Sequence, residues 1–162
     1  MHVRLAGLAD ADAIRTIYNA EVTGSTSTFD LVPRTQADQA AWLRRHGGAH
    51  PAVVAVDTDG TVVGFGSLSA FRDRPAYSTT VENSVYVGTT KRTSGVGRAL
   101  LDELVAQATQ LGFHTMIARV VGGNEASLRL HKACGFELVG VEREIGRKFG
   151  RWLDVWVLQR ML

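Results

Sequence analysis

Apolar residues recur along the chain with two different periods, which divide it into predicted strands and helices. Strands are predicted at residues 2–6, 78–87, 114–121, 136–144 and 151–162, and residues 51–71 predict two more that meet at the Asp59-Gly60 turn. β-Branched and apolar residues are concentrated in 114–121, which indicates a central position in a sheet.

Four helices are predicted from the wider apolar spacing and from capping residues. Asp10 and Thr35 are expected to cap the first two, and the second ends at the Gly47-Gly48 pair. The fourth opens at Asn124 and ends near Gly135. The third ends at Gly112 and has an apolar face formed by Leu100, Leu101, Leu104, Val105, Ala108 and Leu111.

The elements follow one another in the order βααβββαβαββ, which predicts an α/β fold with a mixed sheet and helices on both faces. The chain has 162 residues, so we expect a single domain over residues 1–162. The loop at 24–33 is long and rich in hydroxyl groups, which makes it a candidate active-site wall.

Composition excludes several classes of protein. Hydrophobic residues make up 45% and charged residues 21%, as in ordinary globular proteins, and no apolar run approaches the ~18 residues of a membrane span. Asp10 and Asp12 interrupt the segment where a secretory signal needs an apolar core. The one cysteine, Cys134, is expected to be buried and has no metal-ligand spacing around it. We therefore expect a cytoplasmic protein without a metal site.

The segment 85–108 joins a predicted strand to a helix through a loop of glycines, hydroxyl groups and basic residues. It has neither a P-loop ending nor the dinucleotide fingerprint, so the pattern that remains is Arg92-x-x-Gly95-x-Gly97 at a helix start. Glycines let the backbone approach a ligand, and the free amides of a first helical turn favour negative charge, so a pyrophosphate fits. A tight turn that needs its glycines only for geometry is an equally good interpretation of these residues alone.

The sequence "RTSGVG" at 92–97 matches the Arg/Gln-x-x-Gly-x-Gly/Ala acetyl-coenzyme A signature of the GNAT N-acetyltransferase superfamily, which the chain resembles from "AIRTIYNAEV" onward. Within it, "TVENSVYV", "N-x-A-S-x-x-L-H-K-x-x-G-F" and "GRKFGRWLDV" resemble the group that acetylates phosphinothricin, methionine sulfoximine and methionine sulfone. The resemblance implies the GNAT fold, with a mostly antiparallel sheet splayed at the coenzyme-binding strand. It also implies acetyl-CoA as co-substrate, an amino-acid analogue as acceptor of the acetyl group at its α-amino group, and a homodimer.

The same resemblance assigns the coenzyme to main-chain atoms of the strand before the glycine loop, to the loop itself and to the helix that follows. The implied contacts are Val85, Tyr86, Val87, Arg92, Thr93, Ser94, Gly95, Val96, Gly97, Arg98, Asn124 and Ser127. Taken alone, Asn124 is an ordinary helix N-cap, and the two roles can coexist.

Acetylation of an amine requires that the amine lose a proton and that the departing thiolate be stabilised or protonated. Glu82 falls on the carboxylate proposed as general base in the phosphinothricin group, and partial burial would raise its pKa toward neutrality. His131 stands where many superfamily members have a tyrosine that can protonate the thiolate. From the residues alone, Glu82 is an exposed strand carboxylate and His131 a core histidine. The resemblance makes both catalytic, with His131 acting beside Glu82 or at the thiolate.

The acceptor should carry an α-carboxylate, and an arginine fork suits a carboxylate or a phosphinate. Arg72 and Arg74 are the candidate ligands, with Tyr77 as a wall, although each arginine is also compatible with a solvated loop. Phe29 is expected to close the pocket from the other side. The run 147–152 is assigned to the pocket rim or to a subunit contact, as in relatives.

Three other functions remain open. The chain could acetylate another small amine or amino acid, or bind acetyl-CoA without catalysis, although the presence of Glu82 and His131 favours an enzyme. Local basic clusters at 91–98 and 143–151 raise the possibility of nucleic-acid binding, but the formal net charge is only +2 and no recognition signature is present. We therefore predict a small-molecule amine as partner, and neither nucleic acid nor a membrane.

Overall fold

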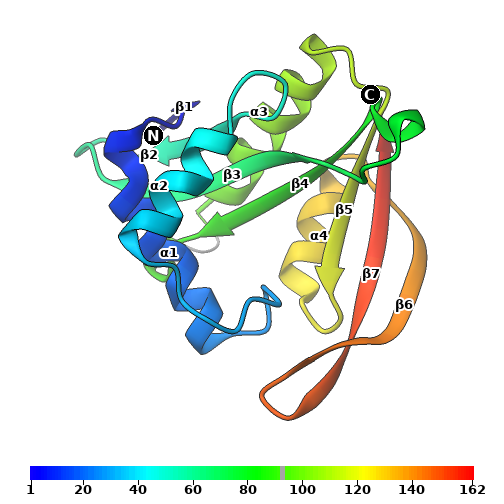
Figure 1. Cartoon of the computed structure of the whole chain (residues 1–162). Coiled ribbons are helices and arrows are strands. Elements are labelled where there is room, and N and C mark those ends of the chain that lie inside the picture. Colours follow the sequence, from blue (N-terminus) through cyan, green and yellow to red (C-terminus); the bar gives the residue numbers. More distant parts are fainter. Residues whose placement is uncertain (92–93) are drawn as a thin grey trace.

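The structure, a computed structural model, describes residues 1–91 and 94–162 and is built around a seven-stranded sheet (Figure 1). The strand order is β1-β2-β3-β4-β5-β7-β6, and among these strands only β4 and β5 are parallel neighbours. The strands are β1 (His2–Leu5), β2 (Ala52–Val56), β3 (Val62–Ala70), β4 (Thr80–Val87), β5 (Thr115–Val121), β6 (Glu137–Lys148) and β7 (Arg151–Met161). This confirms the predicted mixed, mostly antiparallel sheet and the interior position of the segment 114–121.

Helices lie on both faces of the sheet and follow the predicted order (Figure 1). Helices α1 (Ala11–Gly24) and α2 (Gln36–Arg45) cover one face, where Ile14, Tyr18 and Leu43 share a buried cluster with Phe65 of β3. Helices α3 (Val96–Gln110) and α4 (Glu125–Ala133) cover the other face. In the described part of the chain, three short 3₁₀ helices, which the sequence pattern did not predict, lie at Leu8–Asp10, Pro75–Tyr77 and Thr89–Lys91.

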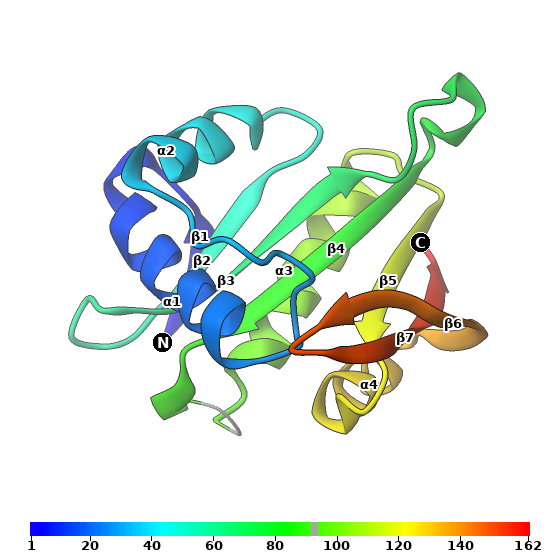
Figure 2. The same cartoon turned by 60° about the horizontal axis from the view of Figure 1, so that its bottom comes forward.

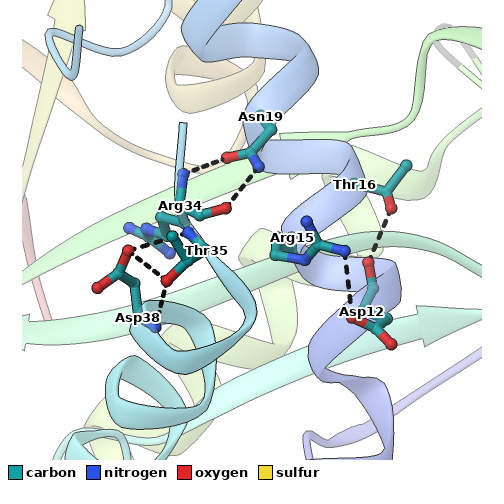
Figure 3. A network of polar contacts seen from close by, with 7 residues as sticks. All are labelled: Asp12, Arg15, Thr16, Asn19, Arg34, Thr35 and Asp38. Atoms are coloured by element: carbon teal, nitrogen blue, oxygen red, sulfur yellow. Dashed lines mark hydrogen bonds and ion pairs between the residues drawn. The ribbon is translucent and has the colours of Figure 1, made fainter. Parts of the chain in front are cut away.

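Three helix N-caps were predicted, and the structure confirms those at Thr35 and Asn124 but not the one at Asp10. Thr35 caps α2, because its hydroxyl oxygen accepts a hydrogen bond from the backbone N–H of Asp38 (Figure 3). Asp10 directly precedes α1, but its carboxylate does not cap the helix. It accepts hydrogen bonds from two guanidinium nitrogens of Arg4 and from Gly7 N, each at 2.8 Å. A bidentate charged partner is stronger than a helix amide, and it lowers the pKa of Asp10.

The connection from α1 to α2 is fixed to α1 by Asn19. Its side-chain amide donates to the carbonyl of Arg34 at 2.9 Å and accepts from the N–H of Arg34 at 2.8 Å (Figure 3). The guanidinium carbon of Arg34 lies 3.7 Å from the centre of the Tyr18 ring. Figure 2 shows that the same connection reaches the tip of the β6–β7 hairpin, so these two segments close one side of the molecule together.

The sheet opens between its two parallel strands. β4 and β5 pair from Thr80 opposite Thr115 as far as Asn83 opposite Ala118, whereas β4 continues to Val87 and β5 to Val121. Each strand keeps its other neighbour over this distance, since Val87 still pairs with Gly64 of β3. Backbone groups on the facing edges beyond Asn83 therefore have no strand partner within the described part of the chain. The predicted splay is at this position.

None of the helices in residues 1–91 and 94–162 is both long enough and apolar enough to span a membrane.

Candidate active site

A cavity of about 460 Å³ occupies the opening between β4 and β5. Side chains alternate across a strand, and Ala118 and Val120 of β5 belong to the core under α3, so Arg119 and Val121 lie on the face of α1 and α2. All four residues line the cavity. The cavity is therefore reached from both faces of the sheet through the parted strands. The remaining walls come from β4, α1, the start of α3 and α4, and include Ser84, Val85, Tyr86, Val87, Glu21, Gly97, Asn124, Ser127 and His131.

The N-terminus of α3 forms one end of the cavity. Gly95 has a φ of 83°, a left-handed conformation that favours glycine, and it directly precedes Val96, the first residue of α3. The first helical hydrogen bond runs from Ala99 N to Gly95 O, so the amides of residues 96–98 have no acceptor within the helix. Such amides and the helix dipole favour an anion. Arg98, which also lines the cavity, forms an exposed pair with Asp102.

The structure brings most of the predicted coenzyme residues to one cavity. Those that line it are Val85, Tyr86, Val87, Gly95, Gly97, Arg98, Asn124 and Ser127. The side chain of Val96 is buried in the core, which leaves its amide as the group available to a ligand, and Ser94 is exposed. Arg92 and Thr93 lie outside the described residues. Asn124 caps α4, accepting a hydrogen bond from Ser127 N at 3.1 Å, as its residue type predicted.

His131 is a buried residue of the cavity wall, with 4% of its surface exposed. Its Nδ1 atom lies 2.8 Å from the carbonyl oxygen of Ser127, one turn earlier in α4, and its Nε2 atom lies 3.1 Å from Oδ1 of Asn83 in β4. The ring of Phe136 packs edge-on against it at 5.1 Å between ring centres. Burial lowers the pKa of His131, although the Ser127 carbonyl opposes this effect.

Glu82 is half-buried on the opposite face of β4 from His131. Asn83, the next residue, points toward α4, so Glu82 points toward the face of α1 and α2. Burial raises the pKa of Glu82; the charges of Arg119 and Arg72 oppose that shift, and Glu142 adds to it. Glu82 does not contribute to the lining of the cavity in the described structure, and β4 separates it from His131.

Arg119 is a site residue that the sequence analysis missed. Its guanidinium forms a two-point ion pair with the carboxylate of Glu142 in β6, in which one N–O distance is 2.9 Å. It therefore connects the cavity wall to Glu142 and contributes to the charge around Glu82. The one available signal was an arginine inside the apolar segment 114–121.

The predicted acceptor ligands lie on the connection between β3 and β4. The guanidinium carbon of Arg72 is 4.8 Å from the Phe71 ring centre and 5.8 Å from that of Tyr77, and its charge acts on Glu82. Arg74 is exposed, and its carbonyl accepts the Tyr77 N–H at the start of a 3₁₀ turn. Of the two arginines, the structure thus places Arg72 within electrostatic range of Glu82.

Phe29 packs on the β6–β7 hairpin. An added Cβ at Gly146 would lie 2.3 Å from Cε2 of Phe29, so the ring occupies the space that any other residue at 146 would need. Phe29 is 38% exposed and is not part of the described cavity lining, to which Ser27 of the same loop contributes. The loop at 24–33 is therefore a wall of the cavity, as predicted, through Ser27.

Lys148 at the end of β6 is buried, with 2% of its surface exposed, although it belongs to the basic cluster at 143–151. Its Nζ atom donates to the carbonyl oxygens of Thr28 at 2.8 Å and Glu21 at 3.4 Å. Burial lowers its pKa, against the charges of Asp30 and Glu21. Lys148 thus joins the β6–β7 hairpin to the loop beside the cavity. Figure 2 shows the hairpin tip next to this loop.

Lys148→Met is expected to lower the free energy of unfolding by about 1–3 kcal/mol, because it leaves the buried Thr28 carbonyl without its donor. Urea denaturation measures this loss. Lys132→Met, at an exposed position of α4, is the matched control and should change stability by less than about 0.5 kcal/mol. Equal stability of the two variants would show that the contact contributes nothing.

Within residues 1–91 and 94–162, no group of three or more His, Cys, Asp or Glu side chains is arranged to hold a metal ion.

A mixed sheet that opens beside a helix N-terminus suited to an anion, with a cavity through the opening, is the architecture of an acetyl-coenzyme A-dependent transferase. The chain belongs to the GNAT acetyltransferase family, since the model of the acetyltransferase (GNAT) domain matches residues 3–157. This confirms the predicted family, its fold, the class of enzyme and acetyl-CoA as its co-substrate.

The names of individual relatives include an amino acid or an amino-acid analogue as the acceptor of the acetyl group. The chain is 39% identical to the L-methionine sulfoximine/L-methionine sulfone acetyltransferase of Pseudomonas aeruginosa strain PAO1, over 97% of this chain and 92% of that protein. The chain also resembles a GNAT superfamily phosphinothricin acetyltransferase from Sinorhizobium meliloti, whose structure was solved in complex with AcCoA. The two sequences are 42% identical, and the two structures superpose with a TM-score of 0.95 over 99% of this chain and 87% of that one. A ribosomal-protein-alanine N-acetyltransferase from Brucella melitensis is 36% identical, with a TM-score of 0.97 over 100% of both chains.

Proposed function

We propose that this protein transfers the acetyl group of acetyl-CoA to the α-amino group of a small amino-acid analogue, such as methionine sulfoximine, methionine sulfone or phosphinothricin. The observation that carries the proposal is the cavity through the sheet, which joins the N-terminus of α3 to the face on which Glu82 lies. The names of the relatives from Pseudomonas and Sinorhizobium support this class of acceptor.

The coenzyme would lie along residues that line the cavity. The amides of residues 96–98 suit the pyrophosphate, and the facing backbone of Ser84–Val87, which has no β5 partner, suits the amides of the pantetheine arm. Asn124 and Ser127 flank this path from α4. The reacting thioester then belongs near Asn83 and His131, where β4 and β5 separate.

The two titratable groups suit two different proton transfers. Glu82 takes a proton from the acceptor ammonium, directly or through a water, and its raised pKa favours this role near neutral pH. The free amine attacks the carbonyl carbon, β4 amides stabilise the oxyanion, and the carbon–sulfur bond breaks. His131 is on the other side of β4, so we assign it to the thiolate: the imidazolium gives its proton to the departing sulfur and is left as neutral imidazole. Arg72 is the proposed ligand of the acceptor carboxylate, with Arg74, Tyr77 and Phe29 on the surrounding loops.

A panel of amines tests the acceptor class. Purified protein, acetyl-CoA and each amine are incubated, released thiol is measured, and the acetylated product is identified by mass. We expect the amino-acid sulfone, sulfoximine and phosphinothricin to exceed simple alkylamines by at least tenfold in kcat/KM. Equal rates on unrelated amines would reject the narrow acceptor class. Coenzyme binding in calorimetry without turnover on any amine would instead indicate a binding module.

We also propose a homodimer that acts in the cytoplasm. β6 is an edge strand, and exposed apolar side chains on it, on the turn after it and at the start of β7 are typical of a subunit contact. These side chains are Leu138, Val139, Val141, Ile145, Phe149 and Trp152. Light scattering on a size-exclusion column should give twice the 17.5 kDa mass of the chain. A mass of one chain at micromolar concentration would reject the dimer.

A further inference from the structure

Asn83 lies at the point where the sheet divides. It is the last residue of β4 that pairs with β5, and only 5% of its surface is exposed. Its side-chain amide donates to the carbonyl oxygen of Ile117 in β5 at 3.2 Å, and its Oδ1 atom lies 3.1 Å from Nε2 of His131 in α4. One side chain therefore joins β4, β5 and α4 at the wall of the cavity.

Both ring nitrogens of His131 face an oxygen. Nδ1 faces the carbonyl of Ser127, with the Ser127 hydroxyl at 3.3 Å, and Nε2 faces Oδ1 of Asn83. A neutral imidazole has one N–H and can donate to only one of these carbonyl oxygens, whereas the imidazolium can donate to both. The Ser127 carbonyl can only accept. The amide nitrogen of Asn83 is held by Ile117, so Oδ1 faces Nε2 as an acceptor and can bond to Nε2–H both in the neutral ring and in the imidazolium, while the Ser127 hydroxyl can donate to Nδ1 of the neutral ring.

We propose that Asn83 is a positioning residue that holds His131 at the cavity wall and pairs with it in both of its protonation states. The histidine can then give a proton and regain it without leaving its place. The effect of this pairing on turnover rests on the proposed acetyl transfer. The pairing itself does not, because it is a property of the protein without substrate.

Charged groups around His131 come from three elements. On β4, Glu82 points to the opposite face; on β5, Arg119 lies on that same opposite face and is paired with Glu142. On α4 itself, Arg129 and Lys132 are exposed, and Cys134 follows the helix. The influences on the pKa of His131 are burial, which lowers it, and the Ser127 carbonyl, which raises it. Of the two hydrogen-bond partners of the ring, Ser127 contributes a backbone carbonyl, so Asn83 is the partner that a substitution can change.

Two substitutions at Asn83 should move the titration of His131 in opposite directions. Asn83→Asp presents a carboxylate that accepts and carries charge, so the protonated ring is favoured and the pKa of His131 should rise by about one unit or more. Asn83→Leu has similar size but no polar atom, so the pKa should fall. The measurement is an NMR titration of histidine-labelled protein without ligands, in which the spectrum of His131→Ala assigns the signal among the five histidines.

Asn19→Asp is the matched control. Like Asn83, Asn19 uses both its amide nitrogen and its amide oxygen, but it bonds to the backbone of Arg34 on the side of the sheet covered by α1 and α2 (Figure 3). It should leave the His131 titration unchanged. In turnover assays, Asn83→Asp should lower kcat about tenfold and displace the pH optimum upward, with the calorimetric affinity for acetyl-CoA unchanged.

An unmoved His131 titration in both folded Asn83 variants would overturn the proposal and leave Asn83 as a strand-pairing residue only. A displaced titration together with no acetyl transfer to any amine would support the pairing and reject the proposed function. The two conclusions are therefore separable in one set of proteins.

Discussion

Glu82→Gln is expected to lower kcat/KM for the amine acceptor by about 10²–10⁴-fold, the usual contribution of a general base. Glutamine has the same shape but cannot take up a proton. Because Glu82 lies outside the described lining of the cavity, the affinity for acetyl-CoA should not change. Thiol-release kinetics and calorimetry measure the two quantities. Glu137→Gln, at an exposed position at the start of β6, is the control; activity of Glu82→Gln equal to that control would remove Glu82 from the mechanism.

The pH profile gives an independent view of the same carboxylate. Burial raises the pKa of Glu82, and a base acts in its deprotonated form, so kcat/KM should fall on the acidic side at a higher pH than for an exposed glutamate. Arg119→Met removes a charge that lowers this pKa, so the acidic limb should move to higher pH. Glu142→Gln removes a charge that raises it, so the limb should move to lower pH. If the acidic limb of the kcat/KM profile stays at the same pH in both variants, that limb reports the titration of a group other than Glu82.

The fold was predictable because its signals are local. The apolar periods, the Asp59-Gly60 turn and the caps at Thr35 and Asn124 each depend on residues close together in the chain, and all of them appear in the structure. The prediction that Asp10 caps α1 was wrong. The Asp10 carboxylate accepts two hydrogen bonds from the guanidinium of Arg4 in β1, which is a stronger partner than a helix amide.

The site was predictable only in part, because its decisive contacts cross the sheet. Arg119 forms an ion pair with Glu142, 23 residues later in the sequence, because β5 and β6 both neighbour β7. His131 meets Asn83, 48 residues away, and Lys148 meets Thr28, 120 residues away. A single sequence carries no periodic signal for such pairs. A buried lysine and a solvated lysine have the same flanking pattern, so burial of Lys148 required the tertiary structure.

The opposite orientation of Glu82 and His131 separates two hypotheses about the histidine. If His131 acted beside Glu82, the two groups would share one proton path and would lie on one face of β4. Asn83 directs His131 to the face of α3 and α4, whereas Arg119 and Arg72 surround Glu82 on the other face. An amine approaching from one face and a thiolate leaving on the other would each have its own titratable group.

His131→Ala alone is therefore expected to lower kcat by about 10²-fold, with little change in acetyl-CoA affinity. Its effect should multiply with that of Glu82→Gln, because the two groups serve different protons. Residues that act as one unit behave differently, since the double variant is then no slower than the worse single variant. Single-turnover measurements of acetyl transfer on the two single variants and the double variant decide between these outcomes. A double variant equal to Glu82→Gln would place His131 in the path of the amine proton and exclude its action at the thiolate.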